Sequence, residues 1–239
     1  MQATEIEQIA VVGAGTMGAT IGQLAAQAGR QVILYDISND ALTQAENRIH
    51  QNLDGAIERK KIQQADKDAT LQRLSFTTSF TEVQGQLILE AIAEDLSAKQ
   101  ALFEQLDRQN PGSTIFATNT SSIPITRIAA GVEHPERVIG MHFFNPAHVM
   151  KLVEVISGNA TSGEVAAAVF QLATEMGKEP VYAADSPGFI VNRIARHFYV
   201  ESLKVLEEQV SSVEGIDRLM EASGFRMGPF QLMDRRDRK

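Results

Sequence analysis

Short apolar runs alternate along the chain with longer segments in which apolar residues recur at helical spacing. Residues 9–12 (IAVV) form the first continuous apolar run, and a glycine-rich turn follows them. Apolar residues then recur every three or four positions, at Met17, Ile21, Leu24 and Ala28. This pattern predicts a buried strand, a turn and a helix that Gly29 ends, and residues 31–36 (QVILYD) predict the second strand.

The same alternation continues to about residue 184. Further strands are predicted within 74–79, 85–95, 113–118, 137–143, 151–157 and 180–184. Helices are predicted at 97–109, which Asn110-Pro111-Gly112 closes, and at 163–176. Residues 38–67 are polar with helical periodicity, so we expect a charged helical hairpin there rather than a part of the core.

The order of these elements sets the fold class. Strands that alternate with helices predict an α/β fold, with a mostly parallel sheet and helices on both of its faces. After Asp185 the pattern predicts one long helix, with Pro187 near its first turn. We therefore expect two domains, 1–185 and 186–239.

Composition narrows the class of protein. The 239 residues are 44% hydrophobic, and no apolar run is as long as the ~18 residues of a membrane span. The polar, acidic first residues do not resemble a signal peptide. The absence of cysteine excludes disulfides and thiolate metal ligands and favours a cytoplasmic protein; we assign no metal ligands. A net charge of −8 disfavours nucleic acid or an anionic membrane as a partner.

A glycine motif follows the first strand. Gly13, Gly15 and Gly18 have the spacing G-x-G-x-x-G, and Asp36 ends the next strand. In this context the glycines permit a tight turn, the approach of a pyrophosphate and close packing of the helix, whose N–H groups attract an anion. Asp36 can bind a ribose diol and would repel a 2′-phosphate, so the motif favours NAD over NADP. The alternative is a glycine-rich turn beside a surface aspartate.

His142 is a candidate general base. It lies at the end of a predicted strand, where open α/β sheets bind their ligands, and an imidazole can accept a hydroxyl proton near neutral pH. A histidine beside Phe143 and Phe144 is also a common core residue.

Glu154 strengthens that hypothesis, because it interrupts the apolar run LVEV. An unpaired carboxylate is costly to bury, whereas a carboxylate paired with an imidazole raises the basicity of the ring and fixes its tautomer. The alternative is that Glu154 faces solvent on an edge strand.

Polar residues occur at two further places of interest. Asn119, Ser121 and Ser122 lie in a loop after a predicted strand, where Ser122 could simply cap a helix. Asn192 lies early in the long helix, where asparagine is a poor helix former, which hints at a need for its amide.

Several motifs together resemble the L-3-hydroxyacyl-CoA dehydrogenases, in particular the bacterial 3-hydroxybutyryl-CoA or 3-hydroxyadipyl-CoA type. They are VVGAGTMG, NTSS, HFFNP, MKLVEV, DSPGFIVNR and GFRMGPF, and the similarity runs from about Ile9 to Asp234. The resemblance implies a Rossmann-type NAD-binding domain with a helical hairpin insertion, followed by part of an all-α C-terminal domain that dimerises. It also implies oxidation of the 3-hydroxyl of an (S)-3-hydroxyacyl-CoA to a 3-oxoacyl-CoA, in fatty-acid, butanoate or phenylacetate-type degradation.

The resemblance also implies roles for individual residues. His142 is then the general base, Glu154 orients and charges it, Ser121 binds the 3-oxygen, and Asn192 positions the histidine and the thioester. The residues expected to bind NAD are Gly13, Gly15, Thr16, Met17, Gly18, Asp36, Glu94, Lys99, Ser121 and Asn145. The serine and lysine with which the family contacts CoA fall near Asn52 and Arg59, which leaves the CoA contacts unassigned.

The chain departs from the family at its end. The family continues after MGPF with an apolar helix, whereas this chain ends in QLMDRRDRK, so we expect a truncated and incomplete helical domain. Two alternatives stay open: another NAD-dependent hydroxyacid dehydrogenase of the same two-domain plan, and an NAD-binding fragment without turnover.

Overall fold

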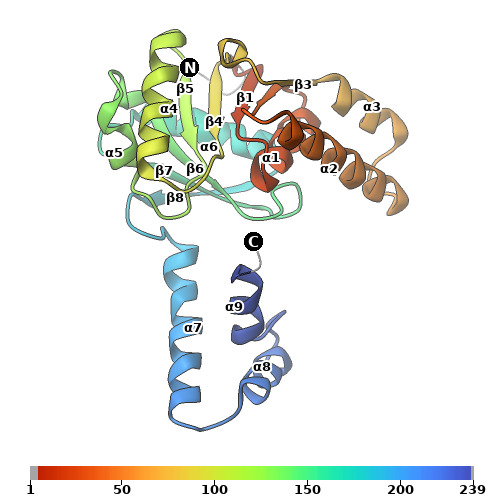
Figure 1. Cartoon of the computed structure of the whole chain (residues 1–239), viewed down its shortest axis with the longest axis vertical. Helices are drawn as coiled ribbons and strands as arrows, with labels where there is room; N and C mark the ends of the chain where they lie inside the picture. Colours follow the sequence, from red (N-terminus) through yellow and green to blue (C-terminus); the bar gives the residue numbers. More distant parts are fainter. Residues whose placement is uncertain (1–4, 238–239) are drawn as a thin grey trace. The chain divides into compact units, whose positions relative to one another are not determined.

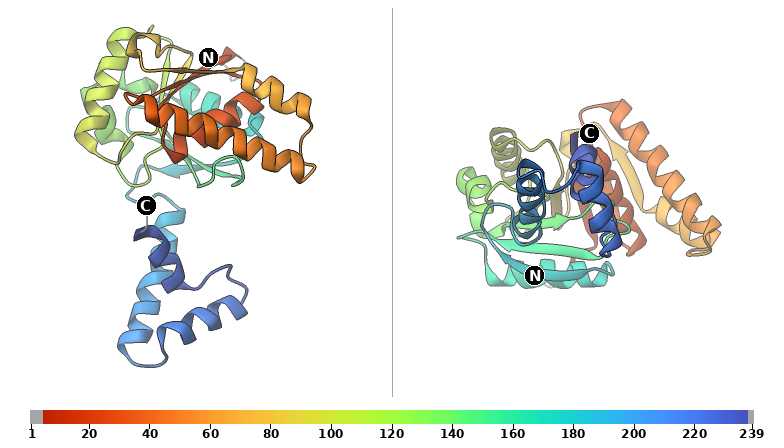
Figure 2. Two further views of the ribbon diagram at one scale, coloured as in Figure 1. Left: turned by 45° about the vertical axis from the view of Figure 1, so that its right-hand side comes forward. Right: turned by 90° about the horizontal axis from the view of Figure 1, so that it is seen from below.

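The structure, a computed structural model, describes residues 5–237. The chain forms two compact units, Met1–Phe189 and Ile190–Lys239. The first unit is an α/β domain, and the second is helical (Figures 1 and 2).

The first unit is built on one eight-stranded sheet. In spatial order its strands are β3 (Leu74–Thr77), β2 (Gln31–Tyr35), β1 (Gln8–Val12), β4 (Leu87–Glu90), β5 (Ile115–Thr118), β6 (Val138–Phe143), β7 (Leu152–Ser157) and β8 (Glu179–Ala184). The strands from β3 to β6 are parallel to one another, β7 is antiparallel to β6, and β8 is parallel to β7. The predicted α/β fold with a mostly parallel sheet is therefore confirmed.

Helices pack on both faces of this sheet, as expected for strands buried on two sides. Their bounds are α1 (Thr16–Gln27), α4 (Leu96–Gln109), α5 (Ile125–Ile128) and α6 (Gly163–Glu175), and short 3-10 helices occur at η2 (Phe80–Glu82), η3 (Ala129–Gly131) and η4 (Pro135–Arg137). Alternate residues of each strand enter different cores, because successive side chains of a strand point to opposite faces. In β1, Ile9 and Val11 join the cluster beside α1 and α6, whereas Ala10 and Val12 join the cluster beside α4.

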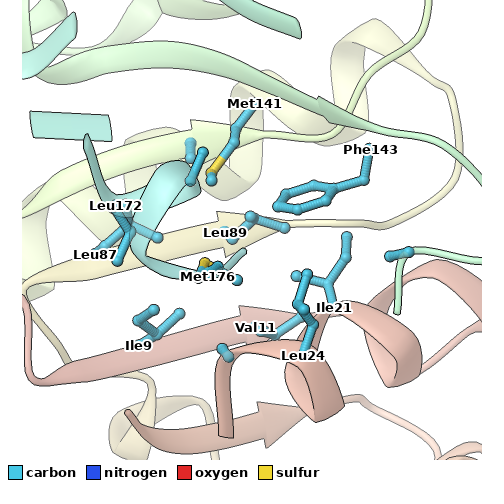
Figure 3. Packing of buried hydrophobic residues seen from close by; sticks show 14 of the residues in the cluster. Ile9, Val11, Ile21, Leu24, Leu87, Leu89, Met141, Phe143, Leu172 and Met176 are labelled. Carbon is cyan, nitrogen blue, oxygen red and sulfur yellow. The ribbon is translucent and has the colours of Figure 1, made fainter. Parts of the chain in front are cut away.

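Figure 3 shows the first of these clusters, where side chains from two helices meet those of three strands. The labelled residues are Ile9, Val11, Ile21, Leu24, Leu87, Leu89, Met141, Phe143, Leu172 and Met176. These side chains are at most 7% exposed, so this face of the sheet is a dry core. The polar side chains at the ends of β4, β5 and β6 therefore lie on the opposite face, beside α4.

The helical hairpin consists of α2 (Asn39–Glu58) and α3 (Gln64–Gln72), which lie beside the β3 edge of the sheet (Figure 1). It is longer than the predicted 38–67, because the helical pattern continues until Arg73 leads into β3. The hairpin is also less separate from the core than expected. One stripe of α2 is buried, at Leu42, Ala45, Ile49 and Leu53.

The second unit contains α7 (Val191–Glu207), α8 (Val213–Ala222) and α9 (Pro229–Asp237). Asp217 of α8 accepts hydrogen bonds from the backbone N–H groups of Phe230 and Gln231 and so caps α9. The Phe198 and Phe225 rings stack within this unit at 4.8 Å between centroids. Within residues 5–237, no helix is both long and apolar enough to cross a membrane.

The prediction for the start of the long helix was wrong. Pro187 lies in a turn before the helix, which begins at Val191. Gly188 has φ +78° and Phe189 has φ +46°, and neither left-handed residue can continue a right-handed helix.

Candidate active site

The carboxyl ends of the parallel strands bring the predicted site residues to one edge of the sheet. Cross-strand pairing places Val12, Glu90, Thr118 and Gly140 in one row. His142 lies two residues farther along β6, on the same face as Glu90 and Thr118. Ligands of open α/β sheets bind outside this edge.

The glycine turn between β1 and α1 is shaped by two close contacts. Gly13 has φ +102°, and a Cβ on it would lie 2.7 Å from the carbonyl oxygen of Ala91. A Cβ on Gly18 would lie 1.7 Å from the carbonyl oxygen of Gly13, so only glycine lets α1 begin this close to β1.

The beginning of α1 is open to an anion. Gly15 is the N-cap residue and has no side chain to bind the N–H groups of the first turn, where Thr16 and Met17 lie. A Cβ built on Gly15 would point into open space. A diphosphate can therefore approach these N–H groups, to which the positive end of the helix dipole adds.

Asp36 lies at the end of β2, beside this turn. Its carboxylate accepts hydrogen bonds from the N–H of Ala14 at 2.8 Å and of Ser38 at 2.9 Å. A cleft of about 690 Å³ opens next to it. The cleft is mostly apolar and is lined in part by Gly13, Gly15, Tyr35, Asp36, Ile37 and Leu102. This combination of an apolar cleft, an acidic rim and an uncapped helix fits a dinucleotide.

His142 and Glu154 form a buried pair. The register of β6 and β7 places them directly opposite each other, and Nδ1 of His142 donates a hydrogen bond to Oε2 of Glu154 at 2.7 Å. His142 is 6% exposed and Glu154 is 0% exposed. The alternative of a solvent-facing glutamate on an edge strand is wrong, because β8 covers the other side of β7.

Aromatic rings enclose the imidazole. The ring of His142 lies 4.6 Å from that of Phe144 and 5.8 Å from that of Phe189, measured between centroids. Because Nδ1 is bound to Glu154, Nε2 is the nitrogen that can exchange a proton with another molecule. The arrangement can therefore act as a general base whose charged form Glu154 stabilises.

The loop after β5 is held from two sides. The side-chain oxygen of Asn119 accepts a hydrogen bond from the N–H of Phe143 at 2.8 Å, which fixes the loop to the residue after His142. Oε1 of Glu94 accepts hydrogen bonds from the Thr120 hydroxyl at 2.7 Å and from the N–H of Ser121 at 2.9 Å. The loop that carries Ser121 is thus held to β6 through Asn119 and to Glu94 through Thr120 and Ser121.

The prediction that Ser122 could cap the next helix was wrong. Asp185 supplies the cap of α5, because its carboxylate accepts hydrogen bonds from the N–H groups of Ile125 and Thr126 at 2.7 and 2.9 Å. Ser122 instead bonds to Glu94, at 3.2 Å from its hydroxyl.

Lys99 of α4 is buried in an ion-pair network. It is 1% exposed, and its Nζ lies 2.6 Å from Oε1 of Glu90 and 3.3 Å from Oε2 of Glu94. Sequence analysis did not identify Glu90, which is 0% exposed. The available signal was a glutamate at the end of the apolar run LILE, the same kind of interruption that identified Glu154.

Two further predicted residues belong to other segments of the chain. Asn145 is exposed in the loop between β6 and β7, a loop that Lys178 holds by donating to the carbonyl oxygens of Ala147 at 2.6 Å and Met150 at 2.9 Å. Asn192 is the second residue of α7 and belongs to the helical unit.

Comparisons with known proteins identify the family to which the two units belong. Residues 8–186 match the model of the 3-hydroxyacyl-CoA dehydrogenase NAD-binding domain, and residues 188–236 match the model of the C-terminal domain of the same family. The first unit is therefore an NAD-binding domain.

Individual relatives are similar over nearly the whole chain. The chain is 49% identical over 231 residues to the 3-hydroxyadipyl-CoA dehydrogenase of Escherichia coli, covering 96% of this chain and 49% of that protein. It is 44% identical over 232 residues to a probable 3-hydroxybutyryl-CoA dehydrogenase of Bacillus subtilis, covering 96% of this chain and 81% of that protein.

A solved structure gives the same result. The crystal structure of 3-hydroxybutyryl-CoA dehydrogenase from Escherichia coli superposes with a TM-score of 0.92 at 48% identity, covering 96% of this chain and 49% of that one. The chain thus spans about half the length of two of the proteins that it matches. On the match of both domain models, the chain belongs to the 3-hydroxyacyl-CoA dehydrogenase family.

Proposed function

We propose that the protein oxidises the 3-hydroxyl of an (S)-3-hydroxyacyl-CoA to a 3-oxoacyl-CoA, with NAD as the acceptor of the hydride. The buried His142–Glu154 pair at the carboxyl edge of the sheet carries this proposal. An alcohol loses a proton as its hydride leaves, and this pair supplies a base beside a dinucleotide site.

In this proposal each residue of the edge has one task. Nε2 of His142 takes the proton of the substrate hydroxyl, and the Glu154 carboxylate stabilises the imidazolium that forms. Ser121 donates a hydrogen bond to the 3-oxygen, and Asn192 of the helical unit orients the histidine and the thioester. The phenyl rings of Phe144 and Phe189 keep water from the imidazole, which strengthens its interaction with Glu154.

The proposed cofactor contacts extend along the same edge. The turn of Gly13, Gly15 and Gly18, with Thr16 and Met17, holds the pyrophosphate, and Asp36 holds the adenosine ribose. Glu94, Ser121 and Asn145 lie at the nicotinamide end. We assign Lys99 to this site through its contact with Glu94 rather than as a direct ligand.

The proposal divides the chain near Asp185 into an NAD-binding domain, 1–185, and a part of the substrate and dimerisation domain, 186–239. The ranges of the two domain models and the division into two compact units support it. It includes a homodimer or other homo-oligomer and a cytoplasmic location, for which the family resemblance and the cysteine-free, acidic composition are the support. Fatty-acid, butanoate and phenylacetate degradation are the pathways in which this reaction would serve.

The direct test is turnover. The protein is offered 3-hydroxyacyl-CoA thioesters of different chain length, with and without a terminal carboxylate, together with NAD or NADP, and formation of the reduced cofactor is followed by absorbance. We expect reduction of NAD that is strongly diminished in His142→Ala. If NADH binds tightly but no 3-hydroxyacyl-CoA is oxidised, the proposed activity of this chain is refuted.

A further inference from the structure

A closed ring of hydrogen bonds and ion pairs holds the loop that carries Ser121, and four of its five residues, Glu90, Lys99, Thr118 and Thr120, are buried. It passes from Glu90 to Lys99, on to Glu94 and Thr120, and back through Thr118. Lys99 Nζ contacts Glu90 Oε1 at 2.6 Å and Glu94 Oε2 at 3.3 Å. The hydroxyl of Thr120 donates to Glu94 Oε1 at 2.7 Å, the N–H of Thr120 to the Thr118 oxygen at 3.2 Å, and the Thr118 hydroxyl to Glu90 Oε2 at 2.6 Å.

The ring distributes its charge unevenly. It holds two carboxylates and one ammonium group, and Glu90 and Lys99 are both buried while the Glu94 side chain is 38% exposed. The charge of Lys99 is therefore balanced by that of the buried Glu90. The remaining negative charge lies on Glu94, the more exposed of the two carboxylates. Burial alone raises the pKa of Glu94, but the Thr120 hydroxyl, the Lys99 charge and the Ser121 N–H outweigh it and keep this carboxyl ionised.

Glu94 in turn fixes the loop. Its Oε1 accepts from the N–H of Ser121 at 2.9 Å and of Ser122 at 3.2 Å, besides the Thr120 hydroxyl. Glu90 acts on the same loop from its other side, because its carbonyl oxygen accepts from the N–H of Asn119 at 2.8 Å. Glu90 is thus linked to the residues that flank Ser121 by two paths, one through Thr118 and the other through Lys99 and Glu94.

We propose that Glu90 is a positioning residue, which acts through Lys99 and Thr118 to set the place of Glu94 and of the Ser121 loop for NAD. This inference rests on the proposed function, which assigns Glu94 and Ser121 to the nicotinamide end. The competing explanation is structural: Glu90 serves only to neutralise the buried charge of Lys99.

Paired substitutions separate the two explanations. Glu90→Gln alone leaves the Lys99 ammonium short of a counter-charge, and its effect would mix misfolding with mispositioning. Glu90→Gln combined with Lys99→Met removes both buried charges together and leaves Glu94 its hydrogen-bond donors in the loop, on Thr120, Ser121 and Ser122. The matched control is Asp107→Asn with Arg137→Met, which removes another buried ion pair of α4 near the amino ends of β5 and β6.

The first measurement is the affinity for NADH, by calorimetric titration of the whole chain, with thermal unfolding as the check on the fold. We expect the double variant E90Q/K99M to fold and to bind NADH about tenfold more weakly, a loss of about 1.4 kcal/mol in binding free energy. The control pair should bind NADH as the wild type does. Wild-type affinity in E90Q/K99M would overturn the proposal.

The second measurement asks whether the effect passes through Glu94. In a protein that already carries Glu94→Gln, adding E90Q/K99M should weaken NADH binding by much less than it does in the wild type, because residues that act in series are not additive. Equal losses in the two backgrounds would contradict a role through Glu94 and leave the structural explanation.

Neither measurement needs an acyl-CoA, so the two proposals can fail separately. A wild type that oxidises no 3-hydroxyacyl-CoA while E90Q/K99M loses NADH affinity would refute the activity and keep the role of Glu90. Full turnover in the wild type with unchanged NADH affinity in E90Q/K99M would do the reverse.

Discussion

Helix α4 takes part in a buried ion pair near each of its ends, and the two pairs serve different edges of the sheet. Near its beginning, Lys99 meets Glu90 and Glu94 at the carboxyl ends of β4 and β5. In its last turn, Asp107 meets Arg137, which directly precedes β6. The same helix therefore shows what a buried charge does beside a candidate site and what it does away from one.

The Asp107–Arg137 pair at the amino edge is buried on both sides. Both side chains are 6% exposed, Arg137 also donates to the carbonyl oxygen of Pro111 at 2.8 Å, and its guanidinium lies 5.0 Å from the centre of the Phe116 ring. At the carboxyl edge, by contrast, the network includes a partly exposed group, the carboxylate of Glu94. Burial of a charge alone thus does not identify a candidate site. A network that connects buried charges to a partly exposed group, such as Glu94, does.

The largest effect on the rate is expected at the carboxyl edge, in the His142–Glu154 pair. We expect His142→Ala to lower kcat by roughly 10²–10⁴-fold, the usual contribution of a general base, and Glu154→Gln to lower it by a large part of that with little change in KM. The double variant should be little slower than His142→Ala, because the two residues act as a unit. Steady-state rates with NAD and a 3-hydroxyacyl-CoA measure this, and fully additive losses would show that the residues work independently.

Substitutions at the amino edge should change the stability of the protein rather than its catalytic rate. Asp107→Asn leaves Arg137 buried without its counter-charge, so we expect the free energy of unfolding to fall by about 3–5 kcal/mol. Urea denaturation measures this loss, and adding Arg137→Met should recover part of it. Below the unfolding transition kcat and KM should stay at wild-type values; a large fall in kcat would break the contrast between the edges.

One change at the carboxyl edge should also act on stability. Gly18→Ala places a Cβ 1.7 Å from the carbonyl oxygen of Gly13, so α1 must move away from the glycine turn. We expect a loss of about 3 kcal/mol in stability, as for an overpacked core, and weaker NADH binding. Gly22→Ala on the same helix is the matched control, because its Cβ would meet side chains at an ordinary 3.6 Å. Equal effects of the two substitutions would show that the close approach at Gly18 is unimportant.

The smallest effect is expected at Asp36. Asp36→Ala removes the carboxylate that favours a ribose diol and repels a 2′-phosphate, so the preference for NAD over NADP should narrow by about tenfold. Asp36→Asn keeps an acceptor for the N–H of Ala14 and separates the loss of charge from the loss of this contact. Kinetics with both cofactors measure the ratio, and a wild type that uses NADP as well as NAD would contradict the assignment.

Much of the first unit could be predicted from sequence because its signals are local. Strands buried on both faces are continuous apolar runs, as in IAVV and LILE, and the glycine motif with Asp36 lies within one strand–helix–strand unit. The meeting of His142 and Glu154 was foreseeable for a related reason. An antiparallel pairing of neighbouring strands brings together two residues only twelve positions apart.

The buried ring could not be predicted in this way. Glu90 and Thr118 are 28 positions apart, and their contact depends on β4 and β5 being neighbours in the sheet, with both side chains on the α4 face. The burial of Lys99 between Glu90 and Glu94 could not be foreseen either, because a sequence does not state which side of a helix faces the sheet. Likewise, the delayed start of α7 follows from the positive φ of Phe189, which non-glycine residues seldom adopt.

The direct opposition of His142 and Glu154 has a consequence for how such a protein can diversify. Five consecutive residue pairs fix the register of β6 and β7, so the geometry of the acid–base pair does not depend on the length of the loop between them. Doubling the length of a flexible loop costs only about 0.6 kcal/mol in closure entropy. That loop exposes Val149 and Met150. Insertions there can therefore remodel the surface next to the reactive groups over evolutionary time while the chemistry is inherited unchanged.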